Sequence, residues 1–173
     1  MSDFIPGPEG FKGKVSLLTK DDMFILPPFL FTNFIDNESG YPAPGLVQRL
    51  LNDISDSLKD INDNKFLIAK VGSVIVGFIG LRVPSEELKY YAVTINPCEL
   101  IIPLASGKFK TMPICLLMNF MKLAKEEGYT EVLLNMDEFD NSTAFKMMDI
   151  ETGEDEFFSD TDGDILVWRW VSS

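Results

Sequence analysis

Histidine is absent from this sequence of 173 residues. Without an imidazole the chain has no Ser-His-Asp or Cys-His nucleophile system, no histidine general base and almost none of the usual zinc sites. The two cysteines, Cys98 and Cys115, are too few for a four-cysteine metal site or a disulfide framework. The sequence therefore predicts neither a metal site nor histidine-dependent catalysis.

Basic residues and long apolar runs are also scarce. Lys and Arg number 15 against 27 Asp and Glu, a net charge of −12, so the surface repels phosphate backbones and we expect no nucleic-acid partner. Met23 to Ile35 is the most apolar early run, but it is too short to span a bilayer and contains Pro27 and Pro28. The N-terminus also lacks a signal-peptide pattern. We expect a cytoplasmic protein that does not enter a membrane.

What is present is typical of one globular domain. The length and a hydrophobic content of 46% suffice for a sizeable core. Residues 1–13 hold three glycines and two prolines, which predicts an extended N-terminal arm, and residues 14–173 are predicted to form the domain.

The N-terminal half contains clear strand and helix signals. Asp22, three residues after Thr19, resembles a capping box, and Gly72-Ser73 suits a type II′ hairpin turn. Apolar residues between positions 44 and 61 recur on one helical face. The expected elements are a strand at 14–18, a short helix that Pro27 ends, a helix at 44–61, and strands at 65–71 and 74–83.

The C-terminal half adds a helix with both ends marked. Thr111 can cap it, Pro113 sits in its first turn and Gly128 follows its end. The expected elements are an extended stretch at 90–104, helices at 112–127 and 140–148, and strands at 131–137, 156–159 and 165–171. A strand–helix–strand unit requires a parallel crossover, so we expect 91–104 and 131–137 to run parallel. The predicted class is α+β, with a central mixed sheet flanked by helices.

Four passages carry a resemblance to a known family. They are Val76-Gly77-Phe78, the stretch ELIIPLASGKFKTMPICLLMNFMKLAKEEGYTEVLLNM, Asn141-Ser-Thr-Ala144, and the terminal strand with Trp168 and Trp170. Together with the order of elements over residues 14–171, they resemble the GNAT superfamily of N-acyltransferases. The resemblance implies that acetyl-CoA lies where the fourth and fifth strands splay apart. Its pyrophosphate would rest on backbone N–H groups at the start of the central helix.

The resemblance also implies which residues would contact acetyl-CoA, if it binds: Lys108, Phe109, Lys110, Thr111 and Asn141. The family's loop reads Arg/Gln-x-x-Gly-x-Gly/Ala, whereas this chain has Thr111 and Pro113 at the two small positions, which adds a Cβ and removes an N–H donor. Lys108 and Lys110 are also compatible with ordinary solvated loop lysines. Whether acetyl-CoA binds therefore stays open.

A second departure concerns proton donation. Many family members carry a tyrosine seven residues after the asparagine of N-x-x-A, and here that position is Met148, which has no proton to give. Glu99 is the best candidate for a general base, since it lies on the strand that leads into the loop and burial could raise its basicity. The alternative is a solvent-facing strand residue. Cys98 has no histidine to activate it and is expected to be a small packing residue.

Two other segments suggest partners. Residues 149–164 carry eight carboxylates, which fit a solvated acidic hairpin or a dock for a basic protein or a lysine-bearing substrate, and which lack the order of a calcium loop. Residues 23–35 are rich in phenylalanine, which fits core packing or a homo-oligomer interface.

Two functions of different classes follow. The first is a GNAT-like protein that has lost acetyl-CoA catalysis and acts as a structural or protein-interaction module in a larger assembly, such as a phage virion. Degenerate domains of this kind occur in phage particles. The alternative is an acetyl-CoA-dependent N-acetyltransferase acting on an amine of a small molecule or protein. The missing small residues and the missing tyrosine favour the first.

Overall fold

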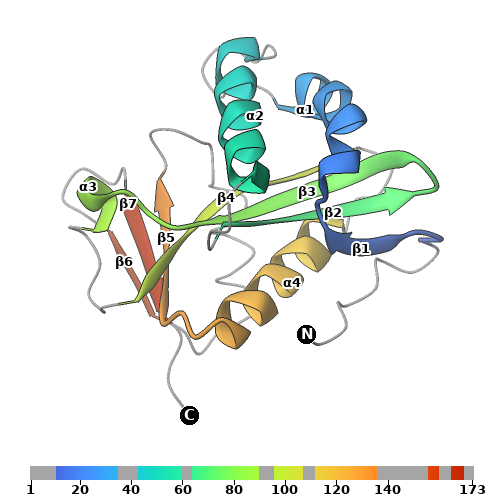
Figure 1. The fold of residues 1–173 in the computed structure, drawn as a ribbon. Coiled ribbons are helices and arrows are strands. Elements are labelled where there is room, and N and C mark those ends of the chain that lie inside the picture. Colours follow the sequence, from blue (N-terminus) through green and yellow to red (C-terminus); the bar gives the residue numbers. More distant parts are fainter. Residues whose placement is uncertain are drawn as a thin grey trace.

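One mixed β-sheet organises the residues that the computed structural model describes, namely 11–34, 43–59, 64–89, 96–106, 112–135, 156–159 and 165–169 (Figure 1). Within these ranges the sheet has seven strands in the order β1-β2-β3-β4-β5-β7-β6. Neighbouring strands are antiparallel except β4 and β5, which are parallel. The strand bounds are Lys14–Leu17 (β1), Lys65–Val71 (β2), Val74–Arg82 (β3), Pro97–Ala105 (β4), Glu131–Asn135 (β5), Glu156–Ser159 (β6) and Ile165–Arg169 (β7).

The parallel pair is joined by helix α4 (Met112–Glu126). A parallel pair cannot be closed by a tight turn, so the chain needs a crossover, and the helix provides it. The prediction of a crossover between these two strands is confirmed, as are the α+β class and the mixed sheet. The expected helix at 140–148 and residues 90–95 lie outside the described residues.

Helix α4 covers one face of the sheet. Leu116 and Phe120 are fully buried there, in one cluster with Ile79 and Leu100 of the sheet. Gly77 on β3 permits a close approach, because a Cβ at this position would lie 3.1 Å from both Leu116 Cδ1 and Met112 Cγ. The glycine of the Val-Gly-Phe segment therefore determines how near the first turns of α4 come to the sheet.

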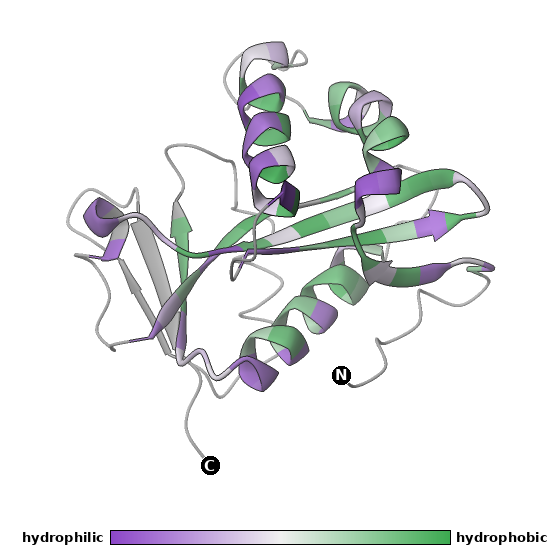
Figure 2. Ribbon diagram, viewed as in Figure 1, coloured by the Kyte–Doolittle hydropathy of each residue, from purple (hydrophilic) through white to green (hydrophobic). Residues whose placement is uncertain are grey.

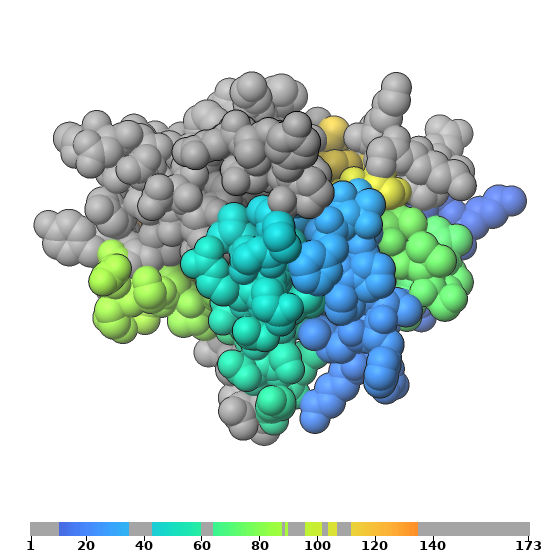
Figure 3. All heavy atoms as spheres, turned by 90° about the horizontal axis from the view of Figure 1, so that it is seen from above, coloured from blue at the N-terminus to red at the C-terminus, as the bar shows by residue number. Residues whose placement is uncertain are grey.

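The opposite face is covered by helices α1 (Leu26–Asn33) and α2 (Pro44–Lys59), which lie next to each other in Figure 3. Val47 and Ile54 on the buried side of α2 belong to a second hydrophobic cluster, which lies on this face of the sheet. The polar residues of α2 lie on the other side of the helix (Figure 2). Because helices cover both faces, β3 is buried along nearly its whole length. A short helix, α3 (Glu86–Lys89), follows β3.

The segment after β1 differs from the prediction in one respect. The capping box forms, with the Thr19 backbone N–H and hydroxyl donating to Asp22 Oδ2 at 2.9 and 3.0 Å, and it opens a 3-10 helix, η1 (Lys20–Phe24). The prediction that Pro27 ends this helix is wrong. Pro27 lies in the first turn of α1, where a missing N–H costs little because that donor has no partner within the helix.

The hairpin between β2 and β3 turns as expected. Gly72 has φ +60, and among the described residues only glycines have positive φ. A type I′ turn would also need positive φ at Ser73, so the backbone fits type II′.

Within the described ranges, each helix is too short or too polar to cross a membrane.

Candidate functional site

The most distinctive feature of the sheet is a fork between β4 and β5. The two strands pair in parallel only at Pro97–Glu131, Cys98–Val132 and Glu99–Leu133 among the described residues. Beyond these pairs β4 continues to Ala105 and β5 to Asn135, and the two strands diverge in Figure 1. We call this opening the fork, and Glu99 and Leu133 form its floor.

Glu99 lies at the floor of the fork and is 1% exposed. Its neighbours on β4, Cys98 and Leu100, belong to the cluster on the α4 side. Because side chains alternate along a strand, Glu99 faces the side covered by α1 and α2. The alternative of a solvent-facing strand residue is wrong, because the Glu99 side chain is buried.

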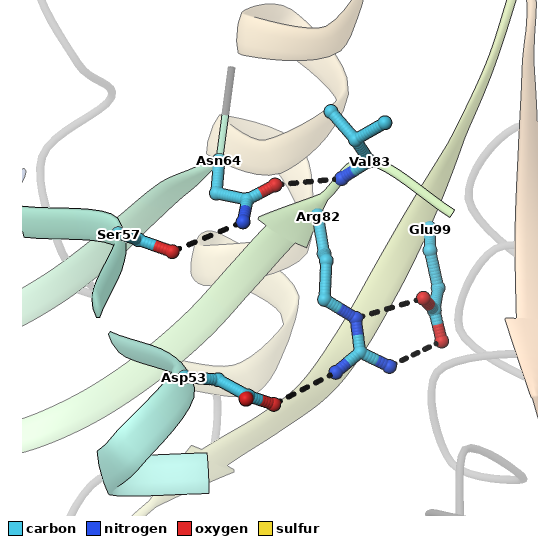
Figure 4. A network of polar contacts seen from close by, with 6 residues as sticks. All are labelled: Asp53, Ser57, Asn64, Arg82, Val83 and Glu99. Atoms are coloured by element: carbon cyan, nitrogen blue, oxygen red, sulfur yellow. Dashed lines mark hydrogen bonds and ion pairs between the residues drawn. The ribbon is translucent and has the colours of Figure 1, made fainter. Parts of the chain in front are cut away.

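Arg82 is the partner of Glu99. It ends β3 directly opposite Glu99 in register, and its Nε and Nη2 donate to the two carboxylate oxygens at 2.9 Å each (Figure 4). Its Nη1 lies 3.5 Å from Oδ2 of Asp53 on α2. A bidentate guanidinium–carboxylate pair is among the strongest of protein hydrogen-bonding arrangements, and it satisfies a charge that would be costly to bury alone.

Arg82 and Asp53 are not among the site residues that the sequence predicts. A signal was nevertheless present. Arg82 is the one charged residue of β3, and Glu99 is the one charged residue of β4. Single opposite charges in two neighbouring apolar strands indicate a buried pair, since neither would be tolerated there alone.

A second set of contacts ties the end of α2 to the same region. Asn64 Nδ2 donates to Ser57 Oγ at 3.0 Å, and its Oδ1 accepts from the backbone N–H of Val83 at 2.8 Å (Figure 4). The last turns of α2 are thus fixed to the end of β3 beside the Arg82–Glu99 pair.

Cys98, on the other face of β4, does not have the properties of a nucleophile. It is fully buried, and its Sγ lies 3.5 Å from the backbone oxygen of Glu131, to which the thiol donates. Burial raises the pKa of the thiol, and the carboxylates of Glu131 and Glu99 raise it further. The thiol stays protonated, which agrees with the predicted packing role.

The start of α4 is only partly described. Met112 is its first residue and is fully buried, and Pro113 is its second. Pro113 has no N–H, so the first turn offers one donor fewer to an anion than other helices do. The predicted contacts Lys108, Phe109, Lys110, Thr111 and Asn141 lie outside the described residues, as do Met148 and most of the acidic segment 149–164. No cluster of metal-ligating side chains occurs in the ranges that the structure covers.

Comparisons with known proteins identify the fold. No protein-family model and no curated protein sequence matches the chain. Among solved structures, the PaiA N-acetyltransferase of Thermoplasma acidophilum in complex with coenzyme A is similar, with a TM-score of 0.63 and 19% identity over 92% of this chain and 99% of that one. A GNAT-family acetyltransferase from Listeria monocytogenes 4b F2365 gives a TM-score of 0.65 and 14% identity over 96% and 99%. The chain therefore has the GNAT fold.

Proposed function

We propose that this chain is an N-acyltransferase that takes its acyl group from acetyl-CoA and transfers it to an amine. The observation that carries the proposal is the fork between β4 and β5, with a buried carboxylate, Glu99, on the face of α1 and α2. Acetyl-CoA supplies the acyl group as a reactive thioester. The sequence motifs favour the non-catalytic module over the enzyme. We prefer the enzyme, because the fork and the placement of Glu99 support it.

The strands of the fork fit an extended ligand of this kind. Past Glu99, the backbone of β4 carries N–H and C=O groups that do not pair with β5 among the described residues, and such groups favour a hydrogen-bonding partner. The resemblance adds Lys108 and Lys110 as candidate contacts for the phosphates and Asn141 as a further contact. These contacts are part of the proposal.

Glu99 is the proposed general base. In N-acyl transfer the amine nitrogen forms a bond to the acyl carbon and loses a proton. The bond from that carbon to sulfur breaks, and coenzyme A leaves as a thiolate that takes a proton from solvent. A carboxylate at the floor of the fork can accept the proton of the amine directly or through water. Its location on the face of α1 and α2 implies that the amine approaches from that face.

The first experiment measures acetyl-CoA binding and turnover on the full chain. Calorimetry gives the affinity for acetyl-CoA, and the release of thiol in the presence of tyramine, spermidine or a lysine-rich peptide gives the rate. Lys108→Glu with Lys110→Glu should weaken binding by about tenfold or more, since hydrogen bonds to charged groups contribute about 1.5–3 kcal/mol. Lys14→Glu with Lys20→Glu, at exposed positions, is the charge-matched control and should leave the affinity unchanged.

The second experiment tests Glu99. Glu99→Gln keeps the shape of the side chain and removes the base, so kcat should fall by about 100-fold or more while acetyl-CoA affinity stays the same. Glu87→Gln, at an exposed position on α3, serves as the control. A Glu99→Gln enzyme with an unchanged kcat would exclude Glu99 as the base.

A second candidate function is the non-catalytic interaction module, which works without acetyl-CoA. Two observations favour it: Pro113 removes a donor from the first turn of α4, and both oxygens of Glu99 accept from Arg82. In this proposal a protein partner binds the acidic segment 149–164 or the region 23–35. Within the latter, Phe29 and Phe34 are buried in the core, while Phe24 is 86% exposed. Absence of acetyl-CoA binding by calorimetry would support this candidate over the enzyme.

A further inference from the structure

Arg82 is held by carboxylates from two layers of the molecule (Figure 4). Glu99 belongs to the neighbouring strand of the sheet, whereas Asp53 belongs to helix α2, which covers the sheet. The guanidinium therefore connects β3, β4 and α2 at the floor of the fork. No motif in the sequence assigns a role to this residue.

The geometry of the pair restricts Glu99 to one orientation. Both hydrogen bonds from Arg82 measure 2.9 Å, and the Glu99 side chain is only 2% exposed. A planar guanidinium that donates through two nitrogens fixes the plane of the carboxylate as well as its position. A lysine at this position would keep the charge but would not fix that plane.

We propose that Arg82 is the positioning residue of the acyl transfer: it holds the Glu99 carboxylate in one orientation at the floor of the fork. The inference rests on the proposed function. Orientation matters because a misplacement of about 1 Å can cost about 100-fold in rate.

Asp53 supplies the matched control. Its side chain is 54% exposed, and its distance of 3.5 Å from Arg82 Nη1 is longer than the two bonds to Glu99. An exposed, loosely formed ion pair contributes little. Asp53→Asn should therefore remove a charge beside Arg82 without disturbing the Arg82–Glu99 pair.

The test compares Arg82→Lys with Asp53→Asn in the full chain, with acetyl-CoA and the acceptors named above. Arg82→Lys should lower kcat by about 10- to 100-fold, leave the KM for acetyl-CoA unchanged and shift the pH profile of kcat. Asp53→Asn should change kcat by less than about fivefold and leave the pH profile in place. If Arg82→Lys does not fold, Arg82→Gln replaces it, since a glutamine amide can donate a hydrogen bond to Glu99 but loses the bidentate fit.

A spectroscopic readout makes the test independent of turnover. In the 1H–15N spectrum of the wild type, the Nε–H of Arg82 should give a downfield signal that exchanges slowly with water. Asp53→Asn should retain this signal, and Glu99→Gln should move it upfield, because a neutral amide oxygen accepts a weaker hydrogen bond than a carboxylate does. Absence of this signal from the wild type overturns the inference. So does an Arg82→Lys enzyme that matches Asp53→Asn in kcat and pH profile, and in that case the proposed function survives. A wild type that neither binds acetyl-CoA nor releases thiol overturns the proposed function, and the positioning role with it.

Discussion

Asp22 is a buried carboxylate away from the fork, and it holds η1 against the sheet. Lys70 of β2 donates to its Oδ1 at 3.0 Å, and the Thr19 backbone N–H donates to its Oδ2 at 2.9 Å. Burial acts to raise the pKa of this carboxyl, but the Thr19 N–H, the Lys70 ammonium and the Thr19 hydroxyl outweigh it, so the pKa is lowered from 3.8. The ionised form is therefore favoured in the folded state.

Asp22→Asn should destabilise the protein in a pH-dependent way. A group whose folded pKa lies below its unfolded value contributes stability above the unfolded value, here 3.8, and loses it as pH falls through the folded pKa. At neutral pH the loss should be about 1–3 kcal/mol, as expected when a buried hydrogen bond to a charge is removed. Urea unfolding should show the difference from wild type shrinking below pH 3.8. The exposed neighbour Asp21 gives the control, Asp21→Asn, and equal effects of the two variants would contradict the prediction.

Gly77 offers a test of packing at a single atom. Gly77→Ala places a methyl group 3.1 Å from Met112 Cγ and Leu116 Cδ1, so α4 must shift or the side chains must repack. Overpacking of this kind costs about 1–3 kcal/mol. Chemical denaturation should show that loss, whereas Gly45→Ala, at an exposed helical position with nothing within 4 Å of the new Cβ, should be neutral or slightly stabilising. A stable Gly77→Ala protein would mean that α4 does not depend on this close approach.

At the scale of elements, helix α4 carries a prediction about its first turn. Pro113 removes an N–H from the end of the helix that would face a phosphate. Pro113→Ala restores the donor, so acetyl-CoA affinity should improve by up to about tenfold, the effect of one hydrogen bond to a charged group. Pro28→Ala, at an exposed position in the first turn of α1, is the matched control for removal of a proline. Calorimetry compares the two, and equal affinities would show that this donor is not used.

The elements with strong local signals could be predicted from the sequence. The α2 and α4 helices have marked ends or one apolar face, and the β2–β3 hairpin has a turn that only glycine suits at its first position, so local rules suffice. The role of Pro27 was mistaken because a proline that ends one helix and a proline that starts the next have the same local pattern. The Arg82–Glu99 pair was missed because it depends on the register between two strands, which local periodicity does not specify.

The net charge of the molecule predicts how fast charged partners associate with it. The chain carries −12, and eight of its carboxylates fall within 149–164. We expect these crowded carboxylates to lie in solvent, where an ion pair contributes only about 0–1 kcal/mol. Neutralising Glu154, Asp155, Glu156 and Asp160 should therefore leave the melting temperature nearly unchanged. Association with a basic peptide such as polylysine should slow, and added salt should have the same effect, because charges are screened over about 8–10 Å. A large loss of stability with salt-insensitive association would show that these residues are structural.

The short pairing between β4 and β5 has a consequence for how the molecule opens. The β2–β3 ladder extends from Lys65–Leu81 to Val71–Val74, whereas the pairing of β4 with β5 in the described ranges stops after Glu99–Leu133. Protection of backbone amides against hydrogen exchange follows the free energy of local opening, which rises with the extent of pairing and burial. The strands β5, β7 and β6 should therefore exchange as one cooperative unit at a lower free energy than β2 and β3. A ligand held in the fork would contact both β4 and β5 and would slow hydrogen exchange in β5 far more than in β2. Exchange rates in β5 would therefore report whether the fork is occupied.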